Sequence, residues 1–502
     1  MKVIIQDRTF GWKELRSCGR IALSTFLAVA TSAVSAADPE PSTKAGSDQI
    51  NPTAKLLQEV IAIDTSNPPG KEGALAEMLA AKLKPLGFQI DIVPTPDEGK
   101  AHLIARLKGN GKKKPILIAA HADVVGVERE KWTMDPFAGT VKDGYVYGRG
   151  AIDFKGGVAV FTRAVMMLAE KKVPLDRDVI LLVEADEEGG KYNTMWLAQS
   201  HWDKIDCEFS LNEGGWILKD DSGKVDYVSI STADKSGISL LITARGTSTH
   251  SSMPLKDNAI FQLSRAMSKL ADYQTQPFLI PSTRQFFTTL SKTSEPPMSR
   301  HYYNIANSKD PAEIAAADAA IRDHSPLFYA LIRNTIAPVF LDAGFRGNVI
   351  PGHATATINF RTIPGTDPEE LRKEIAKVVA GEGIEVTFAT SNRTTPAQME
   401  EYRKRMLSMK PSDEGTELYA SLVSHAKKTY PEAEVTPYLF NAGTDSFAWR
   451  VRGIPVYGIY PYPITDTDLM RMHGNDERVP VDSLQTGTDM IYGVLVDVAG
   501  SK

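Results

Sequence analysis

Residues 115–123 read Pro-Ile-Leu-Ile-Ala-Ala-His-Ala-Asp, an apolar run that ends in a histidine and an aspartate. A second apolar run, Val-Ile-Leu-Leu-Val at residues 179–183, is followed by the acidic stretch Glu-Ala-Asp-Glu-Glu-Gly-Gly at 184–190. Short continuous apolar runs are typical of strands that are buried on both faces, as in parallel sheets. Between the two runs, apolar side chains recur at helical spacing over residues 158–168. This order predicts an α/β domain with a mostly parallel sheet flanked by helices.

Histidine and carboxylate side chains gather at the predicted strand ends. His121 and Asp123 end the first run, and Glu187 and Glu188 follow the second. Glu213 follows a further strand-like run. In open α/β sheets ligands bind in the crevice beyond the carboxyl ends of the strands, so we expect these side chains to meet there.

Metal binding is the chemistry that this set of side chains can support. The chain has only two cysteines, which excludes a disulfide scaffold and a cysteine-rich metal site. Asp153, in a glycine-rich turn, and His473, far downstream, bring the set to two histidines and several carboxylates. Each position alone has a plain structural explanation, such as a helix cap or a turn. Together they could hold two zinc ions that share a bridging carboxylate.

The middle of the chain has a different pattern. Residues 237–244 and 354–361 alternate apolar and polar side chains, as half-exposed strands do, and helical spacing occurs at 259–273 and 368–380. Alternating strands with helices on one side predict an antiparallel α+β layer. An apolar strand pattern returns at 454–459. We therefore expect a smaller lid domain inserted into the α/β domain.

The N-terminus resembles a secretory signal peptide. Five basic residues lie within residues 1–20, an apolar run follows at 21–34, and small residues surround Ala36. This order predicts cleavage near Ala36 and a secreted or periplasmic protein. The apolar run has about 14 residues and a bilayer takes about 20, so we expect no stable membrane span after cleavage. An uncleaved anchor is the alternative.

These patterns predict the whole domain organisation. The predicted parts are a signal peptide (1–36), a flexible leader (37–50), a first part of the catalytic domain (51–235), a lid or dimerisation domain (236–395) and a second part of the catalytic domain (396–502).

The charge of the chain also limits the class of partner. The 57 basic and 62 acidic residues give a formal net charge of −5. Nucleic-acid binding proteins usually show a basic excess, so no nucleic-acid partner is expected. A small molecule is the expected partner.

The order of the polar motifs resembles that of a known family. His-x-Asp at 121–123, a Gly-Arg-Gly turn with Asp153, paired glutamates at 187–188, Glu213 and a late His473 follow one another as in certain di-zinc metallopeptidases. That family includes carboxypeptidase G, aminoacylase, succinyl-diaminopimelate desuccinylase and carboxypeptidase S. The resemblance extends over about residues 55–500, and the stretches 330–333 and 348–351 are nearest to the carboxypeptidase S branch. It implies a zinc-exopeptidase-like fold.

The resemblance implies a role for each member of the set. The ligands of two Zn²⁺ per subunit would be His121, Asp153, Glu188, Glu213 and His473. Asp153 would bridge the two ions, Glu187 would be the general base and Asp123 would support His121. Co²⁺ or Mn²⁺ would fit the same donors. The peptide bond after Asp153 would be cis.

The resemblance also implies a function. It is hydrolysis of the amide bond of small peptides or N-acyl amino acids by a metal-activated water, from which Glu187 takes a proton. The alternative from another class is a catalytically inactive metal-bound scaffold or binding protein, which would not need Glu187. An aminopeptidase of a related di-zinc fold is a third reading, and the expected lid domain argues against it.

The resemblance also implies roles for residues that would contact the substrate. His250 would donate a hydrogen bond to the oxyanion, and in dimeric relatives this histidine reaches into the neighbouring subunit's site. A homodimer through the lid is one alternative that this allows, and the oligomeric state stays open. The substrate-binding candidates are Asn348, Arg361, Gly443 and Thr444. A turn histidine and a structural ion pair are the plain alternatives for His250 and Arg361.

One motif departs from the family pattern. Many relatives have an arginine within two residues after Gly-Thr-Asp-Ser, whereas this chain has Phe447-Ala448-Trp449, with Arg450 later. The requirement for a free substrate carboxylate is therefore open. Phe447 and Trp449 belong either to an apolar pocket or to the core.

Overall fold

The computed structural model describes residues 50–389 and 395–501. The predicted signal peptide (1–36) lies outside the described residues, as does all of the predicted leader except its last residue. Among the helices that are described, none is both long enough and apolar enough to cross a bilayer.

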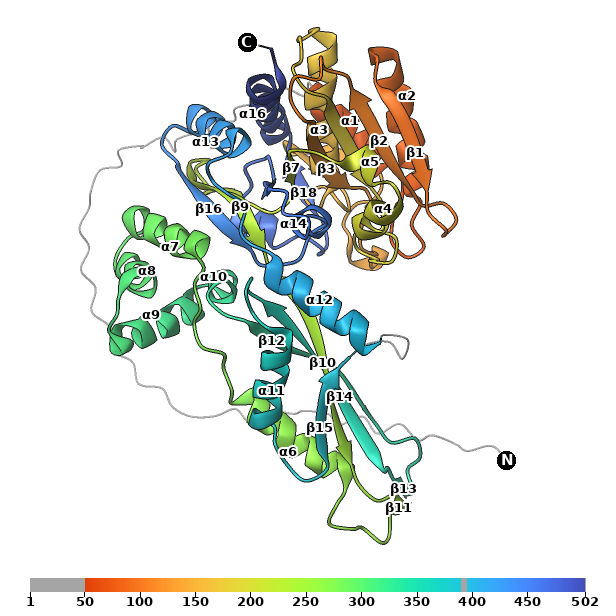
Figure 1. Cartoon of the computed structure of the whole chain (residues 1–502), viewed down its shortest axis with the longest axis vertical. Helices are drawn as coiled ribbons and strands as arrows, with labels where there is room; N and C mark the ends of the chain where they lie inside the picture. Colours follow the sequence, from red (N-terminus) through yellow and green to blue (C-terminus); the bar gives the residue numbers. More distant parts are fainter. Residues whose placement is uncertain (1–49, 390–394, 502) are drawn as a thin grey trace, which may run out of the picture. The chain divides into compact units, whose positions relative to one another are not determined.

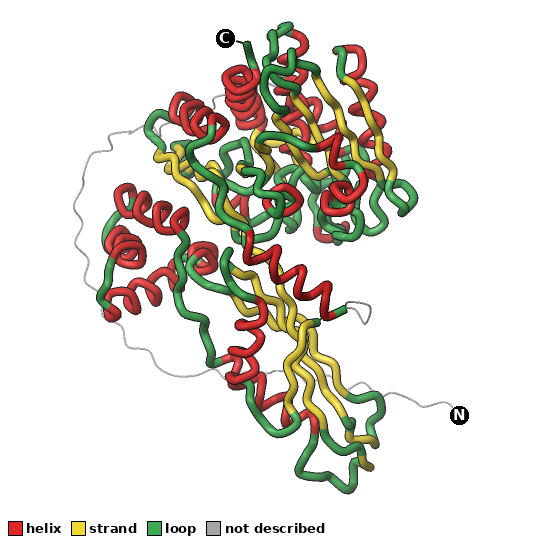
Figure 2. The backbone as a smooth tube through the Cα atoms, in the orientation of Figure 1, coloured by secondary structure: helices red, strands yellow, loops and turns green. Residues whose placement is uncertain are grey.

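A nine-stranded sheet forms the centre of the predicted catalytic domain (Figures 1 and 2). Its middle strands run parallel in the order β6, β3, β7 and β17. Their bounds are Val179–Glu184 for β6, Ile116–His121 for β3, Phe209–Asn212 for β7 and Val456–Gly458 for β17. Early and late segments of the chain, orange and blue in Figure 1, therefore share one sheet. This confirms the predicted α/β fold with a parallel sheet at its centre.

Antiparallel strands extend the sheet at both sides. The hairpin of β1 and β2 adds to β6, and β9 and β16, which are parallel to each other, follow β17. Their bounds are Gln89–Pro94 for β1, Ala101–Leu107 for β2, Val225–Asp234 for β9 and Glu434–Phe440 for β16, and β8 (Ile217–Lys219) pairs with β9.

Both faces of the parallel strands are buried, which explains their continuous apolar sequences. In β3, Ile116 and Ile118 pack into one core cluster, whereas Leu117 and Ala119 pack into another on the opposite face. The helices of the first face are α1 (Pro52–Ile61), α3 (Lys155–Glu170), α13 (Glu417–Thr429) and α16 (Val481–Ala499). Those of the second face are α4 (Thr194–Ser200), α5 (Trp202–Ile205) and α14 (Phe447–Arg450).

A separate four-stranded antiparallel sheet forms the lid, in the order β12, β14, β10, β15. Every second side chain of β10 (Ser236–Arg245) is buried, because only one face of this sheet is covered, by α6 (Ala259–Ala271) and α11 (Pro368–Val378). The other strands are β12 (Thr335–Ala343), β14 (His353–Thr362) and β15 (Ile384–Phe388). The alternating pattern predicted this antiparallel layer.

Four helices within the predicted lid range pack elsewhere. They are α7 (Pro281–Thr293), α8 (Met298–Asn307), α9 (Pro311–His324) and α10 (Pro326–Leu331). The ring of Phe286 lies 5.1 Å from that of Tyr438 on β16 and 5.6 Å from that of Tyr227 on β9. Helix α7 therefore packs against β9 and β16 of the large sheet, while α8 packs on α7 and α9 packs on α8. The boundaries 236–395 stay a prediction.

The remaining elements connect these parts. They are α12 (Pro396–Ser408), α15 (Asp466–Leu469), the short 3₁₀ helices Lys84–Leu86 and Arg129–Lys131, the two-stranded pair β11 (Thr249–His250) and β13 (Val349–Ile350), and the three-stranded sheet of β4 (Thr140–Lys142), β5 (Tyr145–Tyr147) and β18 (Arg478–Pro480). Helix α2 (Glu72–Leu83) instead packs on β1 and β2, and its buried side chains join the core cluster of the first face.

Candidate metal centre and active site

The parallel strands bring most of the predicted ligands to one edge of the sheet. His121 is the last residue of β3, Glu213 directly follows β7, and Glu188 lies in the loop after β6. These three strands are neighbours and run in the same direction, so their carboxyl ends meet. Asp153 precedes α3, and the Asp153–Phe154 peptide is cis. His473 lies between α15 and β18 with a left-handed φ of 59°.

Two groups of donors share Asp153. Nε2 of His121 lies 3.2 Å from Oδ1 of Asp153 and 3.5 Å from Oε2 of Glu213. On the other side, Nε2 of His473 lies 2.9 Å from Oδ2 of Asp153 and 3.0 Å from Oε1 of Glu188. Each group presents three donor atoms that could hold one metal ion. One oxygen of Asp153 faces each group, as a bridging carboxylate requires.

The charges of the surrounding cavity also fit metal ions. The cavity has a volume of about 390 Å³, and its walls include the carboxylates of Asp153, Glu187, Glu188 and Glu213. Arg361 is the only arginine or lysine among the described residues that line it. Four carboxylates that face one arginine favour divalent cations, and imidazole with carboxylate donors suits zinc, cobalt or manganese.

In the metal-free protein, the carboxylates of the site raise the pKa values of the two histidines. Hydrogen bonds to Asp153 and Glu188 raise the pKa of His473 to about 10. Burial lowers the pKa of His121, but the carboxylates of Glu213 and Asp153 raise it well above its ordinary value. Although burial raises it, the two histidines hold the pKa of Asp153 well below the ordinary range. At neutral pH both imidazoles are therefore protonated when no metal is bound.

Metal uptake should therefore release protons. A metal ion needs a neutral imidazole, so each histidine that binds must lose its proton, and the observed affinity should rise about tenfold per pH unit for each proton released. In the metal-free protein, the His473 ion pairs stabilise the fold fully below pH 6.5, and this contribution is lost as the pH rises towards 10. Titration calorimetry in two buffers of different ionisation enthalpy would count the protons. A count of zero at pH 7 would contradict this assignment.

Asp123 holds the loop that carries the paired glutamates. Its carboxylate accepts the backbone N–H groups of Glu187 at 3.1 Å and Glu188 at 3.0 Å. The side chain of Asn67 donates to the same carboxylate at 2.8 Å. Nδ1 of His121 lies 3.0 Å from the backbone carbonyl of Asp123 and 3.8 Å from its carboxylate. The carbonyl thus gives His121 the closer support, and the carboxylate positions the loop.

Glu477 ties the Asp153 turn to the His473 loop. Its carboxylate accepts the backbone N–H groups of Ile152 at 2.8 Å and Asp153 at 3.1 Å, and pairs with the Arg149 guanidinium at 2.6 Å. Arg149 in turn donates to the backbone carbonyl of His473 at 3.2 Å. Sequence analysis missed Glu477, although it lies only four residues after His473.

Glu187 lines the metal cavity without belonging to either donor group. Desolvation raises the pKa of its carboxyl well above the ordinary value, and the negative charges of Asp445 and Glu213 add to this effect. A carboxyl group with a raised pKa accepts a proton more readily near neutral pH, which a general base requires.

Tyr460 is a further site residue that sequence analysis missed. Its hydroxyl lies 3.0 Å from Oδ1 of Asp153 and 2.9 Å from Oε2 of Glu213. Its ring stacks on Trp216 at 4.2 Å and meets the edge of Phe154 at 5.0 Å. It follows β17, the fourth parallel strand, so the same strand-end rule that found Glu213 could have found it.

Replacing Tyr460 by phenylalanine should weaken metal binding. The ring keeps its packing, but the carboxylates of Asp153 and Glu213 lose a hydrogen bond that orients them, and such losses cost about 10- to 100-fold in metal affinity. Competition with a chelator would measure the affinity, and Tyr303→Phe, at an exposed tyrosine, is the control. An unchanged affinity would show that the hydroxyl does not orient the ligands.

The predicted substrate residues divide into two groups. Arg361, Gly443 and Thr444 line the cavity that holds the metal donors. His250 and Asn348 do not line it. They lie together on the lid, where His250 forms a strand pair with Val349 and the backbone N–H of Ser251 donates to the backbone carbonyl of Asn348 at 3.0 Å.

The motif that departs from the family pattern divides between pocket and core. Trp449 is fully buried and donates its ring N–H to the carbonyl of Ile205 at 3.1 Å, so it belongs to the core. Arg450 is buried and pairs with Asp234 at 3.1 Å. Phe447 is half-buried and lines a small cavity beside the metal cavity.

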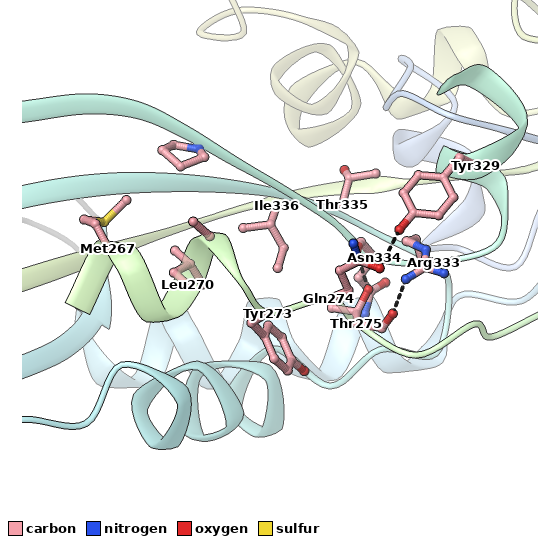
Figure 3. Close-up of a pocket in the computed structure, with 12 residues that line it drawn as sticks. Met267, Leu270, Tyr273, Gln274, Thr275, Tyr329, Arg333, Asn334, Thr335 and Ile336 are labelled. Carbon is pink, nitrogen blue, oxygen red and sulfur yellow. Dashed lines mark hydrogen bonds between the residues drawn. The ribbon is translucent and has the colours of Figure 1, made fainter. Parts of the chain in front are cut away.

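Another cavity, of about 490 Å³, lies between α6 and β12 of the lid and the end of α10 (Figure 3). Two of its polar side chains form hydrogen bonds across the wall: Tyr329 donates to the side chain of Gln274 at 3.1 Å, and Thr275 donates to the backbone carbonyl of Asn334 at 2.6 Å. It contains none of the predicted site residues.

Comparison with known proteins identifies the family of the chain. Residues 117–497 match Peptidase family M20/M25/M40. The chain belongs to this peptidase family. It is therefore a hydrolase that acts on amide bonds, and the resemblance inferred from the motif order is confirmed.

Several relatives cover most of the chain. The human N-fatty-acyl-amino acid synthase/hydrolase PM20D1 is 30% identical over 405 residues, which are 79% of this chain and 77% of that protein. The probable carboxypeptidase S-like 2 of Dictyostelium discoideum is 28% identical and covers 76% and 71% of the two chains. The structure of the M20 family metallo-carboxypeptidase Sso-CP2 from Sulfolobus solfataricus has a TM-score of 0.65 at 20% identity, over 89% of this chain and 99% of that chain. That structure shows the same fold.

Proposed function

We propose that this protein hydrolyses the amide bond of N-acyl amino acids or small peptides with two zinc ions and with Glu187 as the general base. The observation that carries the proposal is the pair of donor groups that share Asp153, with Glu187 on the wall of the same cavity. A binding protein without catalysis would need the donors but not a free carboxyl group beside them.

The residues divide the chemistry between them. His121 and Glu213 would hold one ion, His473 and Glu188 the other, and Asp153 both. When bound, such ions act as Lewis acids and lower the pKa of water towards ~7. Glu187 would take the proton from the attacking water and pass it to the leaving amine. Asp123 keeps Glu187 and Glu188 in place through their backbone N–H groups.

The proposed substrates carry a carboxylate. Arg361 is exposed on β14 and is the arginine in the wall of the metal cavity. Its guanidinium could bind a carboxylate through two parallel hydrogen bonds. The human relative is named for N-fatty-acyl amino acids, which have an amide bond next to a carboxylate. This supports N-acyl amino acids as the substrate class and gives Arg361 the role that many relatives give to an arginine after Gly-Thr-Asp-Ser.

A substrate panel tests the proposal against the inactive scaffold. The full chain would be stripped with a chelator, reloaded with Zn²⁺, Co²⁺ or Mn²⁺, and incubated with N-acyl amino acids and dipeptides. We expect hydrolysis only with metal and a content of two ions per chain by elemental analysis. Two bound ions with no hydrolysis of any substrate would favour the scaffold.

We further propose a homodimer formed through the lid. β12 is an edge strand, and its Phe340 and Leu341 are 73% and 69% exposed. Large apolar side chains on an unpaired strand edge mark an interaction site. His250 lies outside the metal cavity of its own chain, which fits a role as an oxyanion donor in the partner's site.

Mixing two inactive variants tests this dimer. Chains with His250→Ala and chains with Glu187→Gln should together regain an activity that neither has alone, because a mixed dimer holds one site with both residues intact. Phe340→Asp combined with Leu341→Asp should give a monomer in sedimentation analysis. Without recovery in a mixture shown to exchange subunits, His250 does not act across the interface.

Export is also proposed, because of the basic and apolar residues 1–36. Expression of the full chain, followed by fractionation and N-terminal sequencing, should find a product that begins near Ala37 outside the cytoplasm. An intact N-terminus in the membrane fraction would show an uncleaved anchor instead.

A further inference from the structure

A second, smaller cavity adjoins the metal cavity. It has a volume of about 230 Å³, and we call it the side pocket. Gly443 and Thr444 line both cavities, so the two adjoin at this turn. The other walls come from the start of α4, the β9–β10 junction, α12 and α14.

Arg361 lies at the boundary between the two cavities. A Cβ atom placed on Gly237, which lines the side pocket, would come 3.7 Å from its Nη1, and one placed on Gly443 would come 4.0 Å from it. The absence of side chains at both glycines leaves room around the guanidinium. A carboxylate bound to Arg361 would therefore lie at the entrance of the side pocket.

The polar groups in the side-pocket wall are already engaged with one another. The carboxylate of Asp234 accepts hydrogen bonds from Thr444 at 3.0 Å, from Ser446, and from Arg450 at 3.1 Å. The ammonium group of Lys235 donates to the backbone carbonyls of Ala330 at 2.8 Å and Arg333 at 2.7 Å. Few polar atoms are left to bind a polar ligand group.

Apolar side chains form the rest of the wall. Met195, Met409, Phe447 and the ring of Tyr402 are half-buried and line the pocket from three different elements and the segment after α12. Pockets with apolar walls and satisfied polar groups bind apolar ligand groups. Two of the four are methionines, whose flexible side chains adapt to more than one ligand shape.

We propose that the side pocket binds the apolar side chain of the amino acid that carries the substrate's carboxylate. This inference rests on the proposed function. In an N-acyl amino acid the side chain and the carboxylate share one carbon atom, so a carboxylate on Arg361 directs the side chain to the adjoining pocket. The acyl group is attached on the other side of the amide bond, next to the metal donors, and a long acyl chain would exceed the volume of this pocket.

A matrix of substrates tests the assignment. The full-length protein loaded with zinc would be given N-acetyl and N-dodecanoyl derivatives of alanine, leucine and phenylalanine. Each buried methylene changes kcat/KM by about fourfold, so leucine should exceed alanine by about tenfold or more with either acyl group. Comparing the N-acetyl series with the N-dodecanoyl series distinguishes a pocket for the amino-acid side chain from a pocket for the acyl chain.

Substitutions that fill the pocket should remove this preference. Met195→Trp and Met409→Trp place a large ring in the pocket from two different elements, and each should lower the leucine-to-alanine ratio at least tenfold. Phe447→Ala should instead raise the relative rate for the phenylalanine substrate. Leu407→Trp is the matched control, because Leu407 is 41% exposed on α12 and outside the pocket. It should leave the ratio unchanged.

Two results would overturn the inference. One is an unchanged leucine-to-alanine ratio in both filled variants that remain folded by circular dichroism. The other is a loss of preference among acyl chains with the side-chain preference intact, which would assign the pocket to the acyl group.

Calorimetric binding of free leucine and alanine, with and without zinc, covers the case in which no substrate is hydrolysed. Tighter binding of leucine that Met195→Trp removes would then support the pocket although the proposed function fails, and equal binding would refute it.

Discussion

Replacing Glu187 by glutamine is expected to lower kcat by about three orders of magnitude while two metal ions remain bound. The size of the effect follows from the contribution of general acid–base catalysis, about 10²- to 10⁴-fold. Glutamine keeps the shape of the side chain but cannot accept a proton from water. Glu187 belongs to neither donor group, so the metal content should not change.

The measurement compares steady-state rates and metal content of the same preparations. Glu128→Gln, at a glutamate that forms an exposed ion pair with Lys131 outside the cavity, is the control and should behave as the unmodified chain. A loss of metal together with activity would make Glu187 a ligand. A kcat within about threefold of the unmodified chain would refute the general-base assignment.

The pH profile offers a second readout of Glu187. Desolvation and the neighbouring charge of Asp445 raise the pKa of its carboxyl in the metal-free cavity, and the carboxyl must be ionised to act as a base. Bound cations would lower that pKa by attraction. The acidic limb of kcat/KM should therefore flatten in the Glu187→Gln variant, because the titrating base is absent.

The sequence predicted the catalytic sheet well because strand ends leave a local signal. The apolar runs 115–120 and 179–183 became β3 and β6, and their parallel register places His121 beside Glu184 at the end of both strands. The side chains that follow these runs then meet in space for a topological reason. The members of the polar set that lie at strand ends, His121, Glu188 and Glu213, could therefore be brought together from the sequence, whereas Asp153 and His473 do not end a strand.

Other features depend on contacts that have no local signal. The helices α7 to α10 lie within the sequence range predicted for the lid, and only the partner surface of α7, the aromatic side chains of β9 and β16, shows that this group belongs beside the catalytic sheet. Asn67 and Glu477 act through hydrogen bonds to residues 56 and 325 positions away. Chain-distant hydrogen bonds of this kind follow from the fold and cannot be read from spacing.

The lid residues show a different limit. His250 and Asn348 were singled out through family resemblance, and within one chain they lie outside the metal cavity. A single sequence does not contain the position of a second subunit. Their role therefore stays a proposal that depends on the dimer, whereas Arg361, from the same domain, already lines the cavity of its own chain.

Replacing Asp153 by asparagine should have the largest effect on metal binding. The two oxygens of Asp153 face the two donor groups, 3.2 Å from Nε2 of His121 and 2.9 Å from Nε2 of His473. An amide has one oxygen and one N–H₂ group, which cannot bind a cation, and it carries no charge. We expect the metal content to fall from two ions to at most one, with activity below detection.

Stability gives a test of the same variant that does not depend on turnover. A ligand at 100 times its Kd stabilises a protein by about 2.7 kcal/mol per site, so zinc should raise the unfolding temperature of the unmodified chain and of the control Asp489→Asn, at an exposed aspartate on α16. In Asp153→Asn this rise should be mostly lost.

The metal-free variant should also titrate differently. Without the carboxylate of Asp153, which raises it, the pKa of His473 should fall from about 10, and fewer protons should be released on metal uptake. Two tightly bound ions and an unchanged proton count in Asp153→Asn would mean that the ions occupy separate sites, because no other described residue belongs to both donor groups.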